Sequence, residues 1–195
     1  MSIKVSVVIP ARNEEGSLPQ CIRALRHAAQ EAQIDPELLV VINRCTDATE
    51  EVALRLGCRA TRCDAKNLSM IRNFGAAHSC GDIIVTVDAD STIAPNFFIQ
   101  ALRALSTNKV VGGGVPILPE RWSAGIFVTG LLLLPIALRY GISGGAFFTT
   151  RAYFDAIGGF DETLASAEDI DFAKRLKAHG SLLGLRFVTL YNSFI

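Results

Sequence analysis

Two aspartates follow an uncharged, β-branched stretch in the segment GDIIVTVDADST, residues 81–92. A single alanine separates Asp88 from Asp90, so in strand geometry both side chains leave the backbone on the same side. Two convergent carboxylates repel each other unless a cation lies between them. An all-oxygen pair suits Mg²⁺ or Mn²⁺, with water and the phosphates of a nucleotide as the remaining ligands. The alternative for the pair taken alone is an Asx-type turn that caps the next helix.

A second group of acids begins the segment EDIDF, where Glu168, Asp169 and Asp171 fall in the first turn of a predicted helix. Acids at this position complement the helix dipole, and Ser166 stands before Asp169 with the spacing of a capping box. Capping does not explain the glycine-rich segment GGFD at 158–161, because such a loop can bring backbone close to a ligand. A carboxylate at this helix start could therefore also remove a proton from a substrate hydroxyl.

Short apolar runs alternate with helical patterns along the first half of the chain, which favours parallel strands covered on both faces. The predicted strands are residues 5–10, 37–43 and 82–88, and the predicted helices are residues 17–32, 46–56 and 67–79. Right-handed crossovers would give an α/β fold with a Rossmann-like, doubly wound, mainly parallel sheet and helices on both faces. The second half offers a strand that ends at 112–114, a helix from Ser166 to Gly180 and a strand candidate at 182–191.

Each of the three predicted strands of the first half is followed by a polar segment. These segments are PARNEE at 10–15, NRCTD at 43–47 and DAD at 88–90. In a doubly wound sheet the ligand crevice lies beyond the carboxyl ends of the strands. Three polar segments at one edge therefore favour a single binding site over three independent loops.

The composition limits the possible partners. The chain has 195 residues, half of them hydrophobic, which is enough to bury a core as one domain. Basic and acidic residues number 19 each, so no net field points to nucleic acid or to an acidic membrane surface. The chain has no Gly-x-x-x-x-Gly-Lys-Ser/Thr loop and no Gly-x-Gly-x-x-Gly after its first strand, which disfavours phosphate-loop nucleotidases and dinucleotide oxidoreductases.

The cysteine pattern and one apolar segment bear on location. Five cysteines without Cys-x-x-Cys spacing, in a chain without a signal-peptide pattern, point to a reducing cytoplasmic setting. The uncharged segment AGIFVTGLLLLPIAL at 124–138 is shorter than the ~20 residues of a spanning helix and is interrupted by Pro135. A core or partner-facing helix fits it better, with lipid contact at the cytoplasmic face of a membrane as the alternative.

Several segments, in their order along the chain, resemble the inverting family 2 glycosyltransferases with the GT-A fold. They are VSVVIPARNEE at 5–15, NRCTD at 43–47, MIRNFGAAHSCGDIIVTVDAD at 70–90, GGAFFTTRAYFDAIGGFDE at 144–162 and EDIDFAKRL at 168–176. The resemblance implies one GT-A-like domain over 1–195, with a nucleotide-sugar donor half at 1–92 and an acceptor half at 93–195. It also implies a nucleoside-diphosphate sugar as donor, usually with Mn²⁺ or Mg²⁺, and direct displacement that inverts the anomeric centre.

The resemblance carries specific roles over to residues near the donor. Four residues after the first strand would border the nucleotide, namely Pro10, Ala11, Asn13 and Glu14. Asn43 and Asp47 would lie near the base and its loop, and Arg72 would approach the nucleotide. Because an amide both donates and accepts, Asn43 leaves uracil and guanine open. Taken singly, Arg72 could instead lie on the solvated face of a helix, and Asp47 could be a helix cap.

The resemblance also separates the metal ligands from the proton acceptor. Asp88 would lie in the ribose or metal region, and Asp90 would be the principal metal ligand. Asp169 would be the catalytic base that takes the proton of the acceptor hydroxyl, with Glu168 beside it to orient the acceptor. The metal would offset the charge that develops on the departing nucleoside diphosphate.

The expected reaction moves one sugar, because the chain lacks the Gln-x-x-Arg-Trp motif of processive polysaccharide synthases. The acceptor is a saccharide, a lipid-linked compound or another hydroxyl compound. Two alternatives remain. A sugar nucleotidyltransferase would carry a glycine-rich, basic loop after its first strand, and PARNEE is not one. A degenerate relative that binds nucleotide or a membrane-assembly partner would have lost its acids, whereas Asp88, Asp90 and Asp169 are present.

Overall fold

The computed structural model of the protein describes residues 3–118, 145–164 and 166–195. Its elements are β1 (Val5–Ala11), α1 (Leu18–Glu31), β2 (Glu37–Ile42), α2 (Thr49–Arg55), β3 (Arg59–Arg62), α3 (Leu68–His78), β4 (Ile83–Val87), α4 (Phe97–Ser106), β5 (Val110–Gly114), β6 (Ala146–Thr150), α6 (Arg151–Ala156), α7 (Glu168–Leu182) and β7 (Arg186–Thr189). The predicted alternation of strands and helices in the first half is confirmed.

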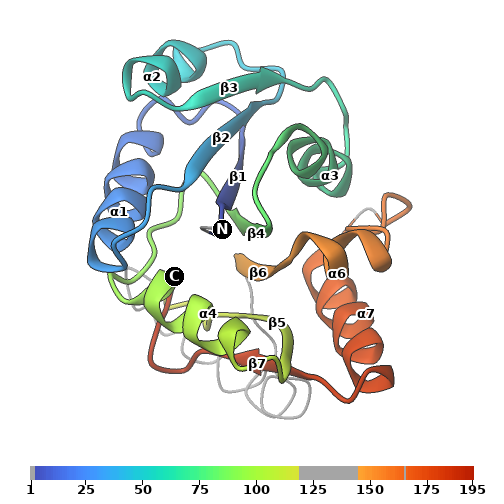
Figure 1. Ribbon diagram of the computed structural model, residues 1–195. Helices are drawn as coiled ribbons and strands as arrows, with labels where there is room; N and C mark the ends of the chain where they lie inside the picture. The colour runs from blue at the N-terminus through green and yellow to red at the C-terminus, as the bar shows by residue number, and fades with distance from the viewer. Residues whose placement is uncertain (1–2, 119–144, 165) are drawn as a thin grey trace, which may run out of the picture.

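Seven strands of the described chain form one sheet in the order β3-β2-β1-β4-β6-β5-β7 (Figure 1). β1 pairs in parallel with β2 and β4, β2 with β3, and β5 with β7. Only β6 among these strands is antiparallel to its neighbours, β4 and β5. The predicted α/β fold with a mainly parallel sheet is confirmed, and the carboxyl ends of β1, β2 and β4 lie at one edge.

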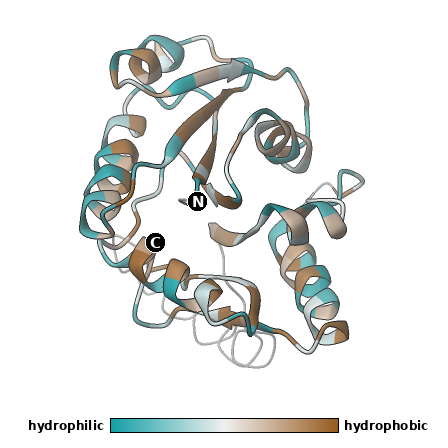
Figure 2. Ribbon diagram, in the orientation of Figure 1, coloured by the Kyte–Doolittle hydropathy of each residue, from teal (hydrophilic) through white to brown (hydrophobic). Residues whose placement is uncertain are grey.

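Helices cover both faces of the sheet, as predicted. α1, α2 and α4 enclose one hydrophobic core, and α3, α6 and α7 enclose a second core on the opposite face (Figure 1). Every residue of β1 and β4 is buried, which accounts for their continuous apolar sequences. The helices instead have one buried and one exposed face, so Figure 2 shows hydrophobic colour along the buried strand β2 and mixed colour along α1.

Two elements depart from the sequence prediction. β3 is absent from the predicted strands because its sequence, RATR, has no apolar run, and it lies at the edge of the sheet with both end residues exposed. α7 continues past its predicted end at Gly180 to Leu182. Gly180 is buried inside the helix, where an added Cβ would lie 2.7 Å from Val111 Cγ1. The chain leaves the helix through Gly184 instead, which has a φ of 71°.

α3 lies close to the sheet because Gly75 has no side chain. A Cβ added there would lie 2.3 Å from Val8 Cγ1 and 2.8 Å from Val41 Cγ2, and both valines are fully buried. We therefore expect Gly75→Ala to lower the free energy of unfolding by about 1–3 kcal/mol through overpacking. Urea denaturation measures this change.

Gly16→Ala is the matched control, because no atom lies within 4 Å of a Cβ added at Gly16. Its free energy of unfolding should stay within about 0.5 kcal/mol of the wild type. Equal destabilisation by the two substitutions would contradict the close packing of α3 on β1 and β2.

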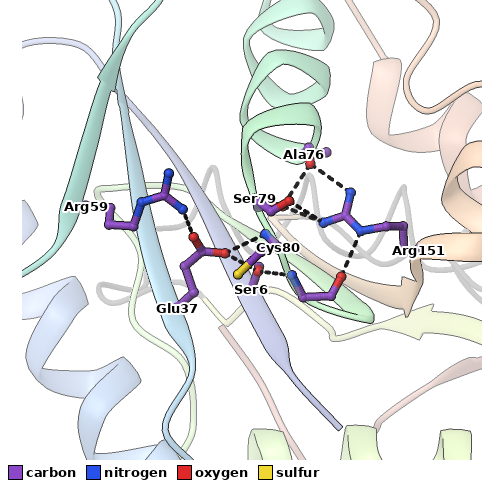
Figure 3. Close-up of polar contacts among 8 residues, drawn as sticks. Ser6, Glu37, Arg59, Ala76, Ser79, Cys80 and Arg151 are labelled. Carbon is purple, nitrogen blue, oxygen red and sulfur yellow. Dashed lines mark hydrogen bonds and ion pairs between the residues drawn. The ribbon is translucent and has the colours of Figure 1, made fainter.

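Polar contacts link the amino ends of the strands, at the end of the sheet opposite the polar segments (Figure 3). Glu37 binds groups near the starts of β1, β3 and β4, namely the Ser6 hydroxyl, the Arg59 guanidinium and the Cys80 amide. Arg151 donates hydrogen bonds to three carbonyl groups, one in the last turn of α3 (Ala76) and two between α3 and β4 (Ser79 and Gly81). These contacts hold the amino ends of the strands together and leave their carboxyl ends open to a ligand.

No helix in the described ranges has both the length and the apolar character needed to cross a membrane. The apolar segment 124–138, for which the sequence favours a core or partner-facing helix, lies outside the described residues.

Candidate active site

Two cavities open at the carboxyl edge of the sheet, and Asp88 and Asp90 line both of them. The smaller cavity, of about 320 Å³, contains the three basic side chains of Arg12, Arg44 and Lys66, and we call it the basic cavity. The larger, of about 750 Å³, adds Asp169 to the two aspartates and has no basic residue in its described lining, and we call it the acidic cavity. The polar segments after β1, β2 and β4 thus meet at one edge, as predicted.

A single guanidinium joins the two groups of acids that lie far apart in the sequence. Arg72 Nη2 donates to Asp88 Oδ1 at 2.8 Å. Its Nη1 donates to Asp169 Oδ1 at 2.7 Å and to Glu168 Oε1 at 3.2 Å. α3 supplies the arginine, the segment after β4 supplies Asp88, and the first turn of α7 supplies the other two carboxylates. The DAD and EDID motifs therefore meet at one cation.

The Arg72 side chain is only 2% exposed, and its guanidinium carbon lies 5.1 Å from the centre of the Phe160 ring. Its Nε has no hydrogen-bond partner among the described residues. Burial by itself would lower the pKa of Arg72, but the Asp88 and Asp169 carboxylates more than offset burial, so the pKa is raised and the guanidinium stays charged. The alternative that Arg72 lies on the solvated face of a helix is wrong.

Asp169 is a partly exposed carboxylate with a raised pKa. Its side chain is 26% exposed and lines the acidic cavity. Burial raises the pKa of Asp169 above the ordinary aspartate value, Asp88 and Glu168 act in the same direction, and Arg72 opposes them. Because Arg72 binds Oδ1, Oδ2 is the oxygen available to a hydroxyl. Glu168 is more enclosed, with 15% of its side chain exposed, and lines neither cavity.

α7 begins without the capping box that the sequence suggests. Its N-cap is Ala167, which has a φ of 61° and makes no side-chain cap, so the pairing of Ser166 with Asp169 is wrong. The Asp169 carboxylate binds Arg72 instead. A non-glycine residue held in the left-handed region costs about 1–3 kcal/mol, and such residues cluster at functional sites.

The glycine-rich loop at 158–161 is held on α3 by Asn73. The Asn73 amide donates to the Phe160 carbonyl at 2.8 Å and accepts from the Phe160 N–H at 2.8 Å. Gly159, with a φ of 67°, lies so close that an added Cβ would be 2.4 Å from Asn73 Oδ1. Asn67 at the start of α3 adds hydrogen bonds to two further carbonyls, those of Glu162 and Leu164. α3 therefore positions both the acids and the loop that precedes them, a role for asparagines that the sequence pattern does not reveal.

The predicted donor residues divide into two groups. Five of them line the basic cavity, namely Pro10, Ala11, Glu14, Asn43 and Asp88. The other three, Asn13, Asp47 and Arg72, line neither cavity. Arg72 binds the acid cluster instead, and Asn13 and Asp47 hold loops together. Asn13 accepts a hydrogen bond from the Thr46 N–H at 2.8 Å. Asp47 accepts from the Thr49 hydroxyl and the Glu15 N–H, and the Thr49 hydroxyl above all holds the pKa of Asp47 below its usual value.

Asn43 has less freedom than the sequence suggests. Its residue is 3% exposed, and Nδ2 donates to the carbonyls of Cys63 at 2.6 Å and Ala65 at 2.8 Å. The amide that we expected to donate and accept therefore has Oδ1 left for a ligand. The cations of the basic cavity are the functional candidates that the sequence analysis missed, although Arg12 and Arg44 stand within the PARNEE and NRCTD segments.

The shared carboxylates fit a divalent cation only as part of its ligand set. Asp90 is exposed and contacts Ser91 at 3.3 Å, and Asp88 keeps one oxygen free of Arg72. No group of three His, Cys, Asp or Glu side chains that could hold a metal occurs in the described part of the chain. Mg²⁺ at phosphate sites uses one or two carboxylates, substrate phosphates and water, which matches two aspartates beside a basic cavity.

The sequence itself decides the family. The sequence model of Glycosyl transferase family 2 matches residues 6–126, well over half of the chain, and includes the segments that form the basic cavity. The chain belongs to this family.

Two curated relatives match a little under half of this family 2 chain. An undecaprenyl-phosphate 4-deoxy-4-formamido-L-arabinose transferase of Salmonella choleraesuis is 34% identical over 97 residues, which cover 45% of this chain and 29% of that protein. A low-salt glycan biosynthesis hexosyltransferase of Haloferax volcanii is 36% identical over 88 residues, covering 45% of this chain and 21% of that protein. The match spans less than a third of the length of these relatives.

Solved structures confirm the GT-A fold. The mannosyltransferase PcManGT from Pyrobaculum calidifontis, in complex with GDP-Man and Mn²⁺, superposes with a TM-score of 0.76 at 19% identity, over 100% of this chain and 57% of that one. S. aureus TarS 1-349 in complex with UDP-GlcNAc superposes with a TM-score of 0.74 at 19% identity, over 99% and 58%. The family 2 chain therefore has the fold that its motifs imply.

Proposed function

We propose that this protein transfers one sugar from a nucleoside-diphosphate sugar to an acceptor hydroxyl, with inversion and with the help of a divalent metal. The observation that carries the proposal is the Arg72 contact, since one buried cation joins Asp88, which lines both cavities, to Asp169 in the acidic cavity. Membership of family 2 and the curated relatives, both named as transferases of sugars, support it.

The donor diphosphate belongs in the basic cavity, because Arg12, Arg44 and Lys66 offset its charge. Pro10, Ala11, Glu14 and Asn43 then border the nucleotide, and Asn13 and Asp47 act through the loops they hold. The described residues that line the basic cavity all lie within 1–92, the proposed donor half. The acidic cavity, where we place the acceptor, is lined by residues of both halves, and 93–195 supply Asp169. The relatives complexed with UDP-GlcNAc and GDP-Man leave both uracil and guanine as candidate bases.

Asp169 performs the proton transfer. The acceptor oxygen forms a bond to the anomeric carbon while its proton passes to Asp169 Oδ2. The bond from the anomeric carbon to the phosphate oxygen breaks, and its electron pair leaves with the nucleoside diphosphate. In this proposal the acceptor oxygen attacks the face of the anomeric carbon opposite the departing diphosphate, which would give inversion. Arg72 holds Asp169 in place, and Glu168 binds the same guanidinium. Because Glu168 does not line the acidic cavity, we assign it to positioning Arg72 and not to orienting the acceptor.

Asp90, with Asp88, would hold Mg²⁺ or Mn²⁺ against the donor phosphates. When bound, the metal offsets the negative charge that develops on the leaving diphosphate. Asp88 and Asp90 would supply two carboxylate ligands, and water and donor phosphate would supply the others.

Thermal-shift titration of UDP, GDP, UDP-glucose, UDP-N-acetylglucosamine and GDP-mannose, with and without Mn²⁺, tests the donor site. We expect at least one nucleotide to raise the melting temperature, and Mn²⁺ to tighten its binding. Asp90→Asn should remove the Mn²⁺-dependent part of the affinity, about tenfold or more, because it deletes a charged ligand.

Asp155→Asn is the control, since Asp155 is an exposed residue of α6 that lines neither cavity. Its nucleotide affinity should match the wild type. Absence of any nucleotide binding would overturn the proposed function, and tight binding that ignores both Mn²⁺ and Asp90 would overturn the metal site.

A further inference from the structure

The glycine-rich loop at 158–161 has no part in the proposed chemistry, yet its phenylalanine contacts the cation of the site. Phe160 is only 1% exposed, and the guanidinium carbon of Arg72 lies over its ring, 5.1 Å from the ring centre. Phe160 lines neither the basic cavity nor the acidic cavity. The contact with Arg72 is therefore a route by which this loop acts on the site without touching a substrate.

The function of Arg72 depends on how its guanidinium is oriented. Nη1 donates to Asp169 and Nη2 donates to Asp88, so a rotation or shift of the guanidinium plane disturbs both contacts. Nε has no hydrogen-bond partner among the described residues, so no hydrogen bond fixes the inner end of the group. A cation over an aromatic ring is attracted by the negative face of the ring, most strongly where water is excluded. The Phe160 ring thus holds the guanidinium where hydrogen bonds do not.

Other aromatic rings hold the Phe160 ring in place. It stacks on Phe172, with ring centres 4.2 Å apart and an interplanar angle of 14°. It also meets Phe147 and Phe154 at steep angles, with ring centres 6.4 and 6.1 Å away. All four rings are buried in one hydrophobic core. Phe172 stands three residues after Asp169 in α7, about one helical turn, so the stack links the helix that carries Asp169 to the cation.

The backbone of Phe160 is fixed as well as its ring. The Asn73 carboxamide binds both the N–H and the carbonyl of Phe160, each at 2.8 Å. Asn73 follows Arg72 directly, so two consecutive residues of α3 contact the backbone and the ring of one loop residue. Arg175 of α7 donates to the Gly159 carbonyl at 2.7 Å. The loop is therefore anchored on both α3 and α7.

We propose that Phe160 is a positioning residue, whose ring holds the Arg72 guanidinium so that Arg72 presents Asp169 to the acceptor hydroxyl. This inference rests on the proposed function and gives the glycine-rich loop a role in it. When the ring is removed, the guanidinium shifts, and the carboxylate that it binds moves with it. A misplacement of about 1 Å by a change far from the chemistry costs about 10²-fold in rate, so a residue outside both cavities affects turnover.

Phe160→Leu and Phe154→Leu separate positioning from packing. Both variants shorten a buried phenylalanine of the same core, and both rings contact Phe172, but the ring beneath Arg72 is that of Phe160. Both should melt at a lower temperature, because each leaves a cavity in the core. At a temperature where both variants are folded, Phe160→Leu should lower turnover by about 10–100-fold, and Phe154→Leu should keep it within a few-fold of the wild type.

Turnover is measured as release of nucleoside diphosphate from the sugar nucleotide that thermal shift selects, with water in place of the acceptor. The water oxygen bonds to the anomeric carbon, Asp169 takes a proton of the water, and the bond to the phosphate oxygen breaks with its electron pair leaving on the diphosphate. Nucleotide affinity should stay within about threefold of the wild type in both variants, because neither ring lines the basic cavity. In Phe160→Leu, kcat thus falls without a matching loss of donor binding.

A second measurement does not depend on activity. Proton–nitrogen NMR spectra contain the Nε–H signal of Arg72, which is identified by its loss in Arg72→Lys. An aromatic ring shifts the resonances of nearby protons, so Phe160→Leu should move this signal and Phe154→Leu should leave it close to its wild-type position. Phe160→Met, whose flexible side chain adapts to the space left by the ring, replaces Phe160→Leu in both measurements if the leucine variant does not fold.

Equal loss of turnover in the two leucine variants, full turnover in Phe160→Leu, or an unmoved Arg72 signal in that variant would overturn the inference, while nucleotide binding would leave the proposed function standing. Failure to bind any nucleotide would instead remove the proposed function on which the inference rests. The Arg72 signal would still decide whether the ring and the cation are in contact.

Discussion

Asp169→Asn lowers kcat by about 10²–10⁴-fold, the range that a positioned general base contributes. The amide keeps the size of the side chain and can still accept a hydrogen bond from Arg72, but it cannot take the proton of the acceptor hydroxyl. Donor binding should persist, because Asp169 lines the acidic cavity and not the basic one. The measurement is the release of nucleoside diphosphate in the presence of acceptor, together with the nucleotide affinity of the same variant.

Asp171→Asn is a matched control on the same helix turn. Asp171 pairs with Arg175 at 2.6 Å, away from Arg72, and lines neither cavity. Its kcat should stay within a few-fold of the wild type. A variant Asp169→Asn that loses donor binding, or one that keeps full activity, would contradict the assignment of Asp169 as base.

The dependence of activity on pH also tests the assignment of Asp169 as base. Burial raises the pKa of Asp169, so its ionised, basic form is lost at a higher pH than for an ordinary aspartate with a pKa of about 3.9. Activity should therefore fall as the pH drops through this raised value. Because the Arg72 cation favours the ionised form, its removal should move the acid limb of the profile to still higher pH.

Arg72→Met lowers the free energy of unfolding by about 3 kcal/mol, the lower end of the range for breaking a buried ion pair. It leaves three carboxylates beside one another without their cation. The lower end applies because Asp88 and Asp169 remain partly exposed, at 33% and 26% of their side chains. Urea denaturation gives the stability change, and kcat against pH gives the shift of the acid limb.

Arg62→Met is the control for removing an arginine from an ion pair. Arg62 pairs with Glu50 at 2.5 Å on the surface, where its own side chain is 76% exposed, so the cost should be less than about 1 kcal/mol. Arg72→Lys should retain part of the stability and keep the acid limb near its wild-type position, because it keeps the charge. Equal costs for Arg62→Met and Arg72→Met would contradict the buried acid cluster.

The sequence predicts the strands that position the donor site because their physical signals are local. β1, β2 and β4 are nearly continuous apolar runs, and each is followed by polar residues that a parallel sheet brings to one edge. The helix with Leu18, Cys21 and Leu25 at helical spacing buries all three, as its periodicity predicts. Strand ends and helix faces are thus readable without long-range information.

Side-chain partners formed by distant segments are not readable in this way. Arg72 stands within an amphipathic helix, and only the packing of α7 beside α3 shows that three carboxylates surround it. Asn43 donates to the Cys63 and Ala65 carbonyls, which follow β3. The sequence of β3, RATR, gives no strand signal, so these partners could not be predicted. The start of α7 carries good capping residues, yet tertiary contact with Arg72 decides where Asp169 points.

The anomeric configuration of the product tests the central claim most directly. Proton NMR of the product formed from an α-linked donor sugar, such as UDP-glucose or GDP-mannose, distinguishes direct displacement from retention. We predict that the wild type forms a β-linked product and that the Asp169→Asn variant does not form it. An α-linked product, or a β-linked product formed equally well without the Asp169 carboxylate, would contradict the account.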